Sequence, residues 1–374
     1  MILPEMKMNS GMDTVTILNR IRKVNPGRTV KLMEVCGTHT MAIAANGIRS
    51  LLPENIKLLS GPGCPVCVTP VSVIDRILEL AMQPDIVIAT YGDMVRVPGG
   101  TRGDSLARRR ALGADVQVVY SPMDAVLLAE ENPEKQVVFL GIGFETTAPG
   151  TAVAILSAAE KKLRNFSVYS ILKTVEPALR KLIATDGFDV DGFLCPGHVA
   201  TVIGSNGFRF LPEEYRIPAV VAGFEAEDIL KAICSLLEQI CDGQPKIENE
   251  YVRAVSSVGN SAARNAIKAC FVPRTAEWRG LGEIRESGLA VSETFREFDA
   301  ERKFRELFRE QKKDLHKVEN LFVSACRCGD IITGRAEPYA CPLFGNCCTP
   351  EDPIGPCMVS GEGSCAAAYK YTGF

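Results

Sequence analysis

The sequence predicts an α/β protein with two related parallel-sheet domains facing a cleft, followed by a cysteine-rich domain that contains helices. Short β-branched runs alternate with helical patterns from about residue 29 to residue 240. Continuous apolar strands separated by helices are typical of parallel sheets covered on both faces. Seven of the 14 cysteines then lie within the last fifty residues, where apolar periodicity is weak and Gly and Pro are frequent.

These patterns divide the chain into four expected regions. Residues 1–28 form a helical segment that packs with the C-terminal domain. Residues 29–120 form α/β domain I, which carries Cys36 and a C-x-x-C motif, and residues 121–240 form α/β domain II. Residues 241–374 form a helical and cysteine-rich domain.

The expected strands are residues 29–35, 56–61, 85–90, 115–120, 136–141, 192–197 and 217–223. In parallel sheets, ligands bind at the loops that leave the C-terminal ends of the strands. The unusual residues fall in those loops, as "CGTHT", "GPGCPVC", "YGDMVRVPGG", "GFETTAPG" and "CPGHVAT". Farther on, we expect residues 274–293 to be rich in loops and residues 295–325 to form one or two charged amphipathic helices.

The chain also contains a faint internal repeat. Residues 36–55 and 195–214 share C-x-x-H, N-G-x-R and L-P-E, whereas residues 85–100 and 136–151 share an apolar strand, a glycine and a later P-G. The repeat indicates two α/β domains of related topology.

Composition excludes several classes of function. The formal net charge is -3 and no basic run occurs, so we expect no nucleic-acid partner. We expect no membrane span, because no run of about 18 apolar residues occurs, and the N-terminus does not read as a signal peptide. We therefore expect a cytoplasmic protein, in which many cysteines indicate metal binding or redox chemistry rather than structural disulfides.

Four cysteines of the tail follow one another at intervals of seven, nine and eight residues: Cys341, Cys348, Cys357 and Cys365. Four thiolates suit zinc or a cubane cluster, and long, turn-rich spacings without paired C-x-x-C knuckles favour [4Fe-4S] over zinc or a non-metal role. Cys326 and Cys328 form an extra pair, and Cys328 could replace one of the four ligands. Cys347 is a spare thiol.

A second group of thiols lies near the N-terminus. Cys64 and Cys67, in "SGPGCPVCVTP", could be a redox dithiol, half of a zinc site or two ligands of a cluster. A helix start nearby favours a thiolate. Cys36 leaves the neighbouring strand, so a shared sheet would bring it close to the pair. His39 could activate a thiol, donate a hydrogen bond or satisfy the loop backbone.

One thiolate beside a dithiol fits a transient metal site with soft sulfur ligands and open coordination positions. Cys195 and His198 repeat the Cys36–His39 spacing, and we interpret Cys195 as a relic of duplication and His198 as a residue that lines the cleft. Plain core packing is the interpretation for three further cysteines, Cys234, Cys241 and Cys270.

The motifs "MEVCGTHT", "GPGCPVCVTP", "ATYGDMVRVPG", "GIGFETTAP", "PGHVATVIG" and "CRCG…CPLFG…CTP…GPCMVSGEGSC" resemble the HypD family of [NiFe]-hydrogenase maturation proteins, from about residue 30 to residue 374. The resemblance implies a scaffold that helps assemble an iron carrying cyanide and carbon monoxide. It implies two partners, a small HypC-type chaperone and a HypE-type cyanide donor. It also implies a [4Fe-4S] cluster in the C-terminal region.

The essential N-terminal thiols of the family match Cys36, Cys64 and Cys67, and its tail cysteines match Cys326, Cys328, Cys341, Cys348, Cys357 and Cys365. The hypothesis is therefore an assembly scaffold rather than a conventional turnover enzyme. Cys36 binds the iron, the C-x-x-C pair is a redox dithiol fed by the cluster, and the chaperone's N-terminal cysteine is a second iron ligand. The residues expected to take part in the chemistry are Cys36, His39, Cys64, Cys67, Cys326 and Cys328.

Two other functions remain open at this point. A stand-alone, cluster-driven thiol–disulfide reductase would use the same cysteines without iron at Cys36. A structural adaptor would use metals only to stabilise its fold. A radical S-adenosylmethionine enzyme is disfavoured, because no C-x-x-x-C-x-x-C motif occurs.

Overall fold

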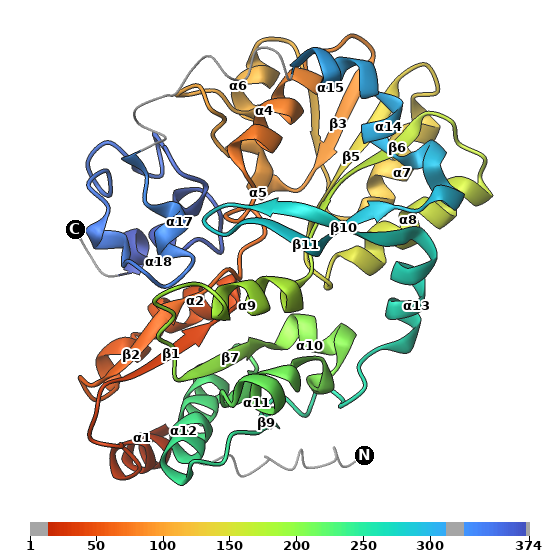
Figure 1. Ribbon diagram of the computed structural model, residues 1–374. Coiled ribbons are helices and arrows are strands. Elements are labelled where there is room, and N and C mark those ends of the chain that lie inside the picture. Colours follow the sequence, from red (N-terminus) through yellow and green to blue (C-terminus); the bar gives the residue numbers. More distant parts are fainter. Residues whose placement is uncertain (1–13, 312–324, 372–374) are drawn as a thin grey trace, which may run out of the picture.

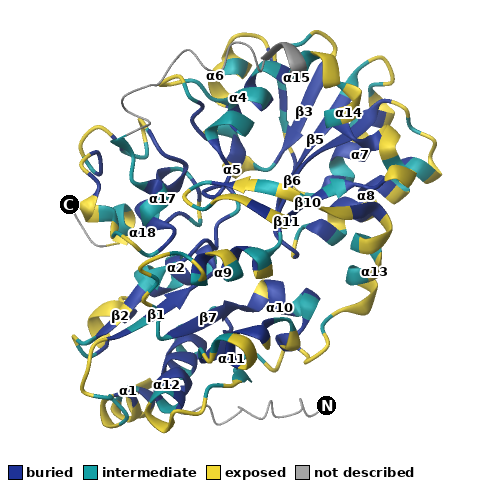
Figure 2. Cartoon of the chain, viewed as in Figure 1, coloured by how far each residue is buried: buried dark blue, intermediate teal, exposed yellow. Residues whose placement is uncertain are grey.

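The computed structural model describes residues 14–311 and 325–371. It confirms an α/β fold with two parallel sheets and a cysteine-rich C-terminal region. Figure 1 shows the sheets in separate lobes, with a long hairpin between them and the cysteine-rich tail at one side. Figure 2 shows that the central strands of both sheets are buried, whereas three edge strands are only partly buried and the outer faces of the covering helices are exposed.

The first sheet has the strand order β2-β1-β7-β8-β9, and every neighbouring pair in it is parallel. Its strands are β1 (Val30–Glu34), β2 (Ile56–Ser60), β7 (Gly192–Pro196), β8 (Ala219–Ala222) and β9 (Ile247–Asn249). Its helices are α1 (Thr14–Lys23), α2 (Gly37–Ala45), α3 (Ile48–Leu51), α10 (Gly197–Ile203), α11 (Phe210–Tyr215) and α12 (Ala226–Asp242).

The second sheet has the order β4-β3-β5-β6 and is also parallel. Its strands are β3 (Ile86–Thr90), β4 (Asp115–Val118), β5 (Gln136–Gly143) and β6 (Phe166–Leu172). The helices along this part of the chain are α4 (Val71–Leu80), α5 (Gly92–Val95), α6 (Leu106–Ala111), α7 (Pro122–Glu131), α8 (Ala148–Glu160) and α9 (Val175–Ile183).

All seven expected strands are present, whereas β6 and β9 were not predicted. The grouping of the strands differs from the expected one. Each sheet combines strands from both sides of residue 120, because β1 pairs with β7 and β3 pairs with β5. The two halves of each internal repeat therefore lie on neighbouring strands of one sheet, not in two domains. The domain ranges themselves stay a prediction.

Helix α1 packs against α12, not against the C-terminal domain as expected. Ile17 and Ile21 are buried in the same apolar cluster as Ile229 and Ile233 of α12. The apolar face of a short amphipathic helix has to be covered, and here α12 covers it. The expected placement of this segment was wrong for residues 14–23, and residues 1–13 lie outside the described residues.

The segment expected to be loop-rich, residues 274–293, lies largely in an antiparallel hairpin of β10 (Phe271–Trp278) and β11 (Gly282–Val291). Trp278 is fully buried, stacks on Phe144 with ring centroids 5.9 Å apart, and donates its indole N–H to Ser287 Oγ at 2.8 Å. Lys173, which follows β6, donates from Nζ to the carbonyl of Glu277 at 2.7 Å. These contacts fix the hairpin to the second lobe.

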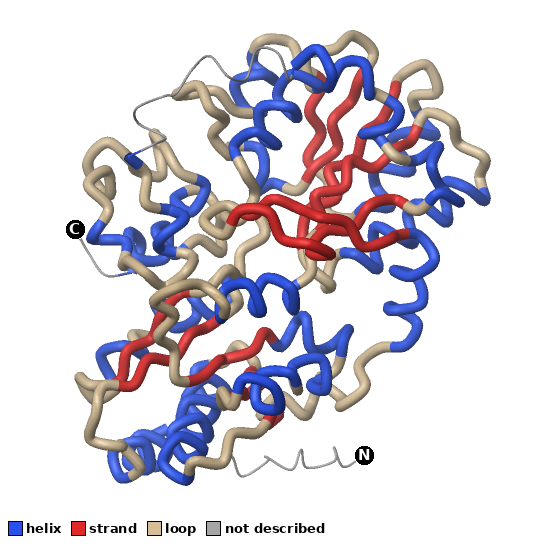
Figure 3. Tube along the Cα trace, in the orientation of Figure 1, coloured by secondary structure: helices blue, strands red, loops and turns tan. Residues whose placement is uncertain are grey.

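The remaining elements are short. Before and after the hairpin come α13 (Ser261–Cys270), α14 (Ala300–Lys303) and α15 (Arg305–Gln311), and the tail contains α17 (Cys328–Ile331) and α18 (Ser364–Tyr371). The charged segment is thus broken into short helices over its described part, and His316 lies outside the described residues. Figure 3 shows the tail as mostly loop. No helix in the described part of the chain is both long and apolar enough to cross a bilayer.

A buried carboxylate connects the loop after β5 to the start of α9. Glu145, in the loop after β5, accepts from the N–H of Val175, the first residue of α9, at 2.9 Å. Burial raises the pKa of Glu145 from 4.5 to about 7, and its hydrogen bond to the α9 N-terminus opposes this rise only in part. The folded chain therefore binds a proton here between these two pH values that the unfolded chain releases.

We expect this carboxylate to weaken the fold as pH rises. Its contribution to stability is fully present below pH 4.5 and is lost as pH rises through about 7. Glu145→Gln removes the titration, so the variant should gain about 2–3 kcal/mol relative to the unmodified chain between pH 5 and pH 8. Urea unfolding at both pH values measures this gain, with the exposed Glu160→Gln as the control. An equal pH dependence in all three proteins would contradict the expectation.

Candidate thiol and iron site

Parallel pairing of β1 and β2 places the first residues after each strand side by side. Cys36 caps the N-terminus of α2, and Gly63 and Cys64 follow β2. The N–H of Gly37 donates to the carbonyl of Gly63 at 3.2 Å. A Cβ at Gly63 would overlap the backbone of Val35 and Cys36, so only glycine permits this approach. The sheet therefore brings Cys36 next to the C-x-x-C loop.

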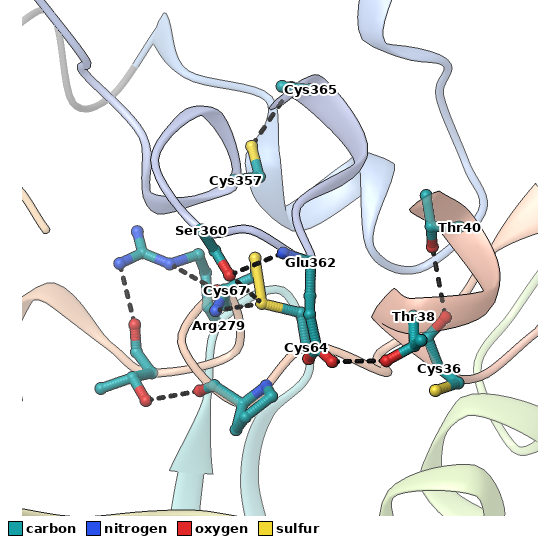
Figure 4. The surroundings of a disulfide bond; sticks show 12 residues. Cys36, Thr38, Thr40, Cys64, Cys67, Arg279, Cys357, Ser360, Glu362 and Cys365 are labelled. Carbon is teal, nitrogen blue, oxygen red and sulfur yellow. Dashed lines mark hydrogen bonds between the residues drawn. A yellow bond between two sulfur atoms is a disulfide. The ribbon is translucent and has the colours of Figure 1, made fainter. Parts of the chain in front are cut away.

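Cys64 and Cys67 form a disulfide with a Cα–Cα distance of 5.2 Å. They are 4% and 0% exposed. The N–H of Cys67 donates to Cys64 Sγ at 3.1 Å, and Ser360 Oγ lies 3.3 Å from the same sulfur. A disulfide sulfur carries no proton, so the Ser360 hydroxyl is the donor. Figure 4 shows the disulfide between the Cys36 loop and the tail.

Arg279, at the tip of the β10–β11 hairpin, binds three consecutive carbonyls of the chain that follows the disulfide. Its Nε donates to Cys67 at 3.1 Å, its backbone N–H to Val68 at 2.8 Å, and its Nη2 to Thr69 at 2.8 Å. The three accepting residues are buried. Buried carbonyls without partners would cost about 1–3 kcal/mol each.

A tail loop covers the Cys36 side of the site. Thr38 donates from Oγ1 to Glu362 Oε1 at 2.7 Å, and Gly37 lies so close to Glu362 that a Cβ there would overlap it. Burial raises the pKa of Glu362. The cysteine-rich tail is thus in direct contact with both N-terminal loops (Figure 4).

Cys36 is protonated in this closed arrangement. Burial, and then the nearby Glu362 carboxylate, raise the pKa of the Cys36 thiol to about 12, whereas the backbone N–H groups of His39 and Thr38 lower it. A thiolate forms here only with compensation from a cation. Metal ligation supplies such compensation, because a bound metal displaces the thiol proton.

His39 is fully buried, and its ring Nε2 donates to the carbonyl of Gly223 at 2.9 Å and lies 3.3 Å from that of Ala222. Burial lowers the pKa of His39 to about 4, so the ring is neutral. The ring of Phe224 is tilted against His39 and stacks with His198, at centroid distances of 4.9 and 3.9 Å. These contacts of the ring connect α2 to the end of β8 and the residues that follow it. A role in activating a thiol stays a prediction.

The cysteines of β7, α12 and α13 fall into a buried group and one exposed residue. Cys195 and Cys270 are fully buried and Cys234 is 5% exposed, and burial raises the pKa of all three thiols. Core packing is confirmed for Cys234 and Cys270. It is wrong for Cys241, which is exposed and donates to the carbonyl of Val24 at 2.9 Å.

The tail cysteines lie close to the loop of Ser360, which contacts the disulfide. Cys357 and Cys365 have sulfurs 3.2 Å apart, and a hydrogen bond to Cys357, together with burial, raises the pKa of Cys328. Gly355 packs against Cys326 Sγ. Burial raises the pKa of Cys326 to about 12, which Arg279 opposes.

Cys341 and Cys348 lie on the neighbouring loop, where Cys348 Sγ accepts from the N–H of Ile354 at 3.3 Å. Both are buried, whereas Cys347 is exposed. The donor set, five buried thiols and the half-buried Cys326, fits a group that prefers sulfur ligands. Within the described ranges, no three Cys, His, Asp or Glu side chains are already grouped to hold a metal ion.

Sequence reasoning missed Arg279, Ser360 and Glu362. The first lies in the segment expected to be loop-rich, and the other two are ordinary polar residues of the tail. The run "EWRGLG" places the one tryptophan of the sequence beside an arginine and just before two glycines. That run is the signal that could have indicated a packed hairpin tip.

The fold and the site define a class: a parallel α/β protein whose strand ends present thiols beneath a cysteine-rich tail. The family model HypD, described as "Hydrogenase formation hypA family", matches residues 13–372. The chain belongs to the HypD family of hydrogenase maturation factors.

Three relatives illustrate the similarity. Hydrogenase maturation factor HypD of Escherichia coli (strain K12) is 44% identical over 345 residues, covering 92% of this chain and 90% of that protein. HypD of Rhodobacter capsulatus is 45% identical over 347 residues, with coverage of 92% and 90%. HypD of Azotobacter vinelandii is 44% identical over 355 residues, with coverage of 93% and 91%.

We expect Gly63→Ala to separate the Cys36 loop from the disulfide loop. The added methyl group cannot be accommodated without moving backbone, which should cost about 1–3 kcal/mol of unfolding free energy. Chemical unfolding measures the loss. The control is Gly150→Ala in α8, where an added Cβ meets Pro122 only at 3.6 Å. A Gly63→Ala protein as stable as the control would contradict the close packing.

Proposed function

We propose that this chain is a scaffold on which an iron bearing cyanide and carbon monoxide is assembled for a [NiFe] hydrogenase. The observation that supports this most strongly is the meeting of three elements at one edge of the first sheet. They are the single thiol of Cys36, the Cys64–Cys67 disulfide and the tail loop of Ser360 and Glu362. A monothiol beside a dithiol supports a role in which one thiolate holds a metal and the pair exchanges electrons.

In this proposal Cys36 binds the incoming iron as its thiolate and releases its proton. Soft sulfur ligation with open positions suits an iron that also carries strong-field diatomic ligands. Cys64 and Cys67 accept two electrons and two protons when their disulfide is reduced, and return them when it closes. His39 holds the α2 N-terminus against β8 through its carbonyl contacts.

Cys341, Cys348, Cys357 and Cys365 would hold a [4Fe-4S] cluster, with Cys326 and Cys328 beside it. When bound, such a cluster supplies single electrons close to the dithiol. The contact of Cys328 with Cys357 makes Cys328 a competitor for a ligand position.

The partners in this proposal are a HypC-type chaperone and a HypE-type cyanide donor. The chaperone must bring a second ligand to the iron at Cys36, so its surface lies around the loops that surround Cys36. It does not lie on the charged segment of residues 292–318. The cyanide donor approaches the same loops.

Cys36→Ala should abolish the infrared bands of metal-bound cyanide and carbonyl in the anaerobically purified complex with the chaperone. The visible spectrum of the tail cluster should not change, because Cys36 is not among the proposed cluster ligands. Cys241→Ala, which removes an exposed thiol, is the matched control. Full band intensity in Cys36→Ala would move the iron ligand to Cys64 or Cys67.

Cys341→Ala should remove the cluster's visible absorbance and destabilise the tail, because metal binding there also contributes folding free energy. Iron content and absorbance after anaerobic reconstitution measure this. Cys347→Ala, at the exposed neighbouring thiol, should keep both. A full cluster in Cys341→Ala together with none in Cys328→Ala would replace Cys341 by Cys328 in the ligand set.

Turnover on unrelated protein disulfides distinguishes a stand-alone reductase from the proposed scaffold. A general thiol–disulfide reductase should reduce unrelated protein disulfides catalytically, and the scaffold should not. Cys64→Ser should stop maturation in the scaffold and leave the cluster in place, whereas a structural adaptor would mature hydrogenase normally with Cys64→Ser.

A further inference from the structure

Arg279 concentrates its hydrogen bonds on one short stretch of chain. Its Nε, backbone N–H and Nη2 donate to the carbonyls of Cys67, Val68 and Thr69, at 3.1, 2.8 and 2.8 Å. This stretch begins at a disulfide cysteine and ends just before α4. The guanidinium is therefore hydrogen-bonded to the backbone of Cys67, the disulfide cysteine that is completely buried.

Arg279 is held in place by the packing of its two neighbours in the sequence. Trp278, its neighbour, is buried against Phe144, with Lys173 Nζ 5.1 Å from its ring centroid. On the other side, Gly280 packs directly on Gly329 of the tail, where a Cβ on Gly280 would overlap the Gly329 backbone. Arg279 is thus fixed between the second lobe and the tail, and the disulfide loop is tied to both through it.

We propose that Arg279 is a positioning residue that sets the reduction equilibrium of the Cys64–Cys67 disulfide. This goes beyond the proposed function and rests on it only in taking this pair as the working dithiol. Reduction takes up two electrons and two protons, breaks the S–S bond and leaves two thiols, a fraction of which loses a proton to the solvent at pH 8.5 and becomes negatively charged. A fixed cation bonded to the carbonyl of Cys67 stabilises that state more than it stabilises the neutral disulfide.

The test measures the equilibrium directly on the full chain. The protein is incubated anaerobically at pH 8.5 with dithiothreitol and its cyclic disulfide in known ratios. Dithiothreitol supplies two electrons and two protons and closes to its own disulfide as Cys64–Cys67 opens. Alkylation and mass spectrometry of the peptide with both cysteines then give the reduced fraction.

The informative variants are Arg279→Gln, which is neutral but can still donate to a carbonyl, and Arg279→Lys, which keeps the charge. Arg285→Gln, at an exposed arginine of the same hairpin, is the matched control. We expect Arg279→Gln to favour the disulfide about tenfold, equivalent to about 30 mV for this two-electron couple. Arg279→Lys, which keeps the charge, should stay close to the equilibrium of the unmodified chain. Arg285→Gln should shift the equilibrium less than twofold.

A reduction equilibrium within twofold of the unmodified chain in Arg279→Gln would overturn the proposal. So would an equal shift in Arg285→Gln, or a shift in Arg279→Lys as large as in Arg279→Gln, because charge would then not be the cause. Thermal unfolding of each variant shows that the comparison is between folded proteins. The measurement needs neither iron nor chaperone. Its result therefore remains valid even if Cys36→Ala keeps its cyanide and carbonyl bands and the iron ligand has to be reassigned.

Discussion

The parallel pairing of β1 with β2, closed by the contact of Gly63 with Cys36, is the constraint on which the site depends. Parallel strands end at the same edge of a sheet, so the residues after them share one location. Here those residues are a monothiol on one loop and a dithiol on the next. Without a glycine at position 63 the two backbones could not approach so closely, and Cys36 and Cys64 would belong to separate sites.

Two segments that are distant in the sequence, the hairpin tip and the tail loop, also contribute residues to the site. The hairpin tip supplies donors to the chain after the disulfide, and the tail loop supplies Ser360 and Glu362 to the disulfide and to α2. Both cover the thiols and remove water from them. Desolvation is accordingly the first cause of the raised pKa of Cys36, and burial acts in the same direction on Cys326. The site favours protonated or metal-bound sulfur over free thiolate.

Local patterns in the sequence predicted the strands well, because continuous apolar runs bounded by glycine and proline carry that information within a few residues. They could not predict which strands pair. The order β2-β1-β7-β8-β9 joins residues more than a hundred positions apart, and nothing in a single strand specifies its neighbour. The repeat of Cys36–His39 in Cys195–His198 was a true signal, but it marked neighbouring strands of one sheet rather than two domains.

The residues of the candidate site were likewise predicted only in part from the sequence. Cysteine spacing identified Cys36, Cys64, Cys67 and the tail thiols, because cysteine is rare enough for its spacing to be informative. Arg279 could not be found by spacing, since its partners are backbone carbonyls from a segment about 210 residues away. The exposure of Cys241 and the burial of Cys348 beside the exposed Cys347 are also tertiary properties, which identical residue types do not reveal.

Burial of the dithiol bears on the choice between a scaffold and a general reductase. A reductase that acts on many proteins needs a sulfur that a folded substrate can reach. Cys64 is 4% exposed and Cys67 is not exposed, with Ser360 against one sulfur and Arg279 against the chain beyond the other. A bulky protein disulfide cannot approach this pair unless the tail loop moves, whereas a small ligand bound at Cys36 would already lie on the neighbouring loop. The geometry therefore favours a dithiol that serves cargo held within the protein, and the tail that covers it becomes part of the same site.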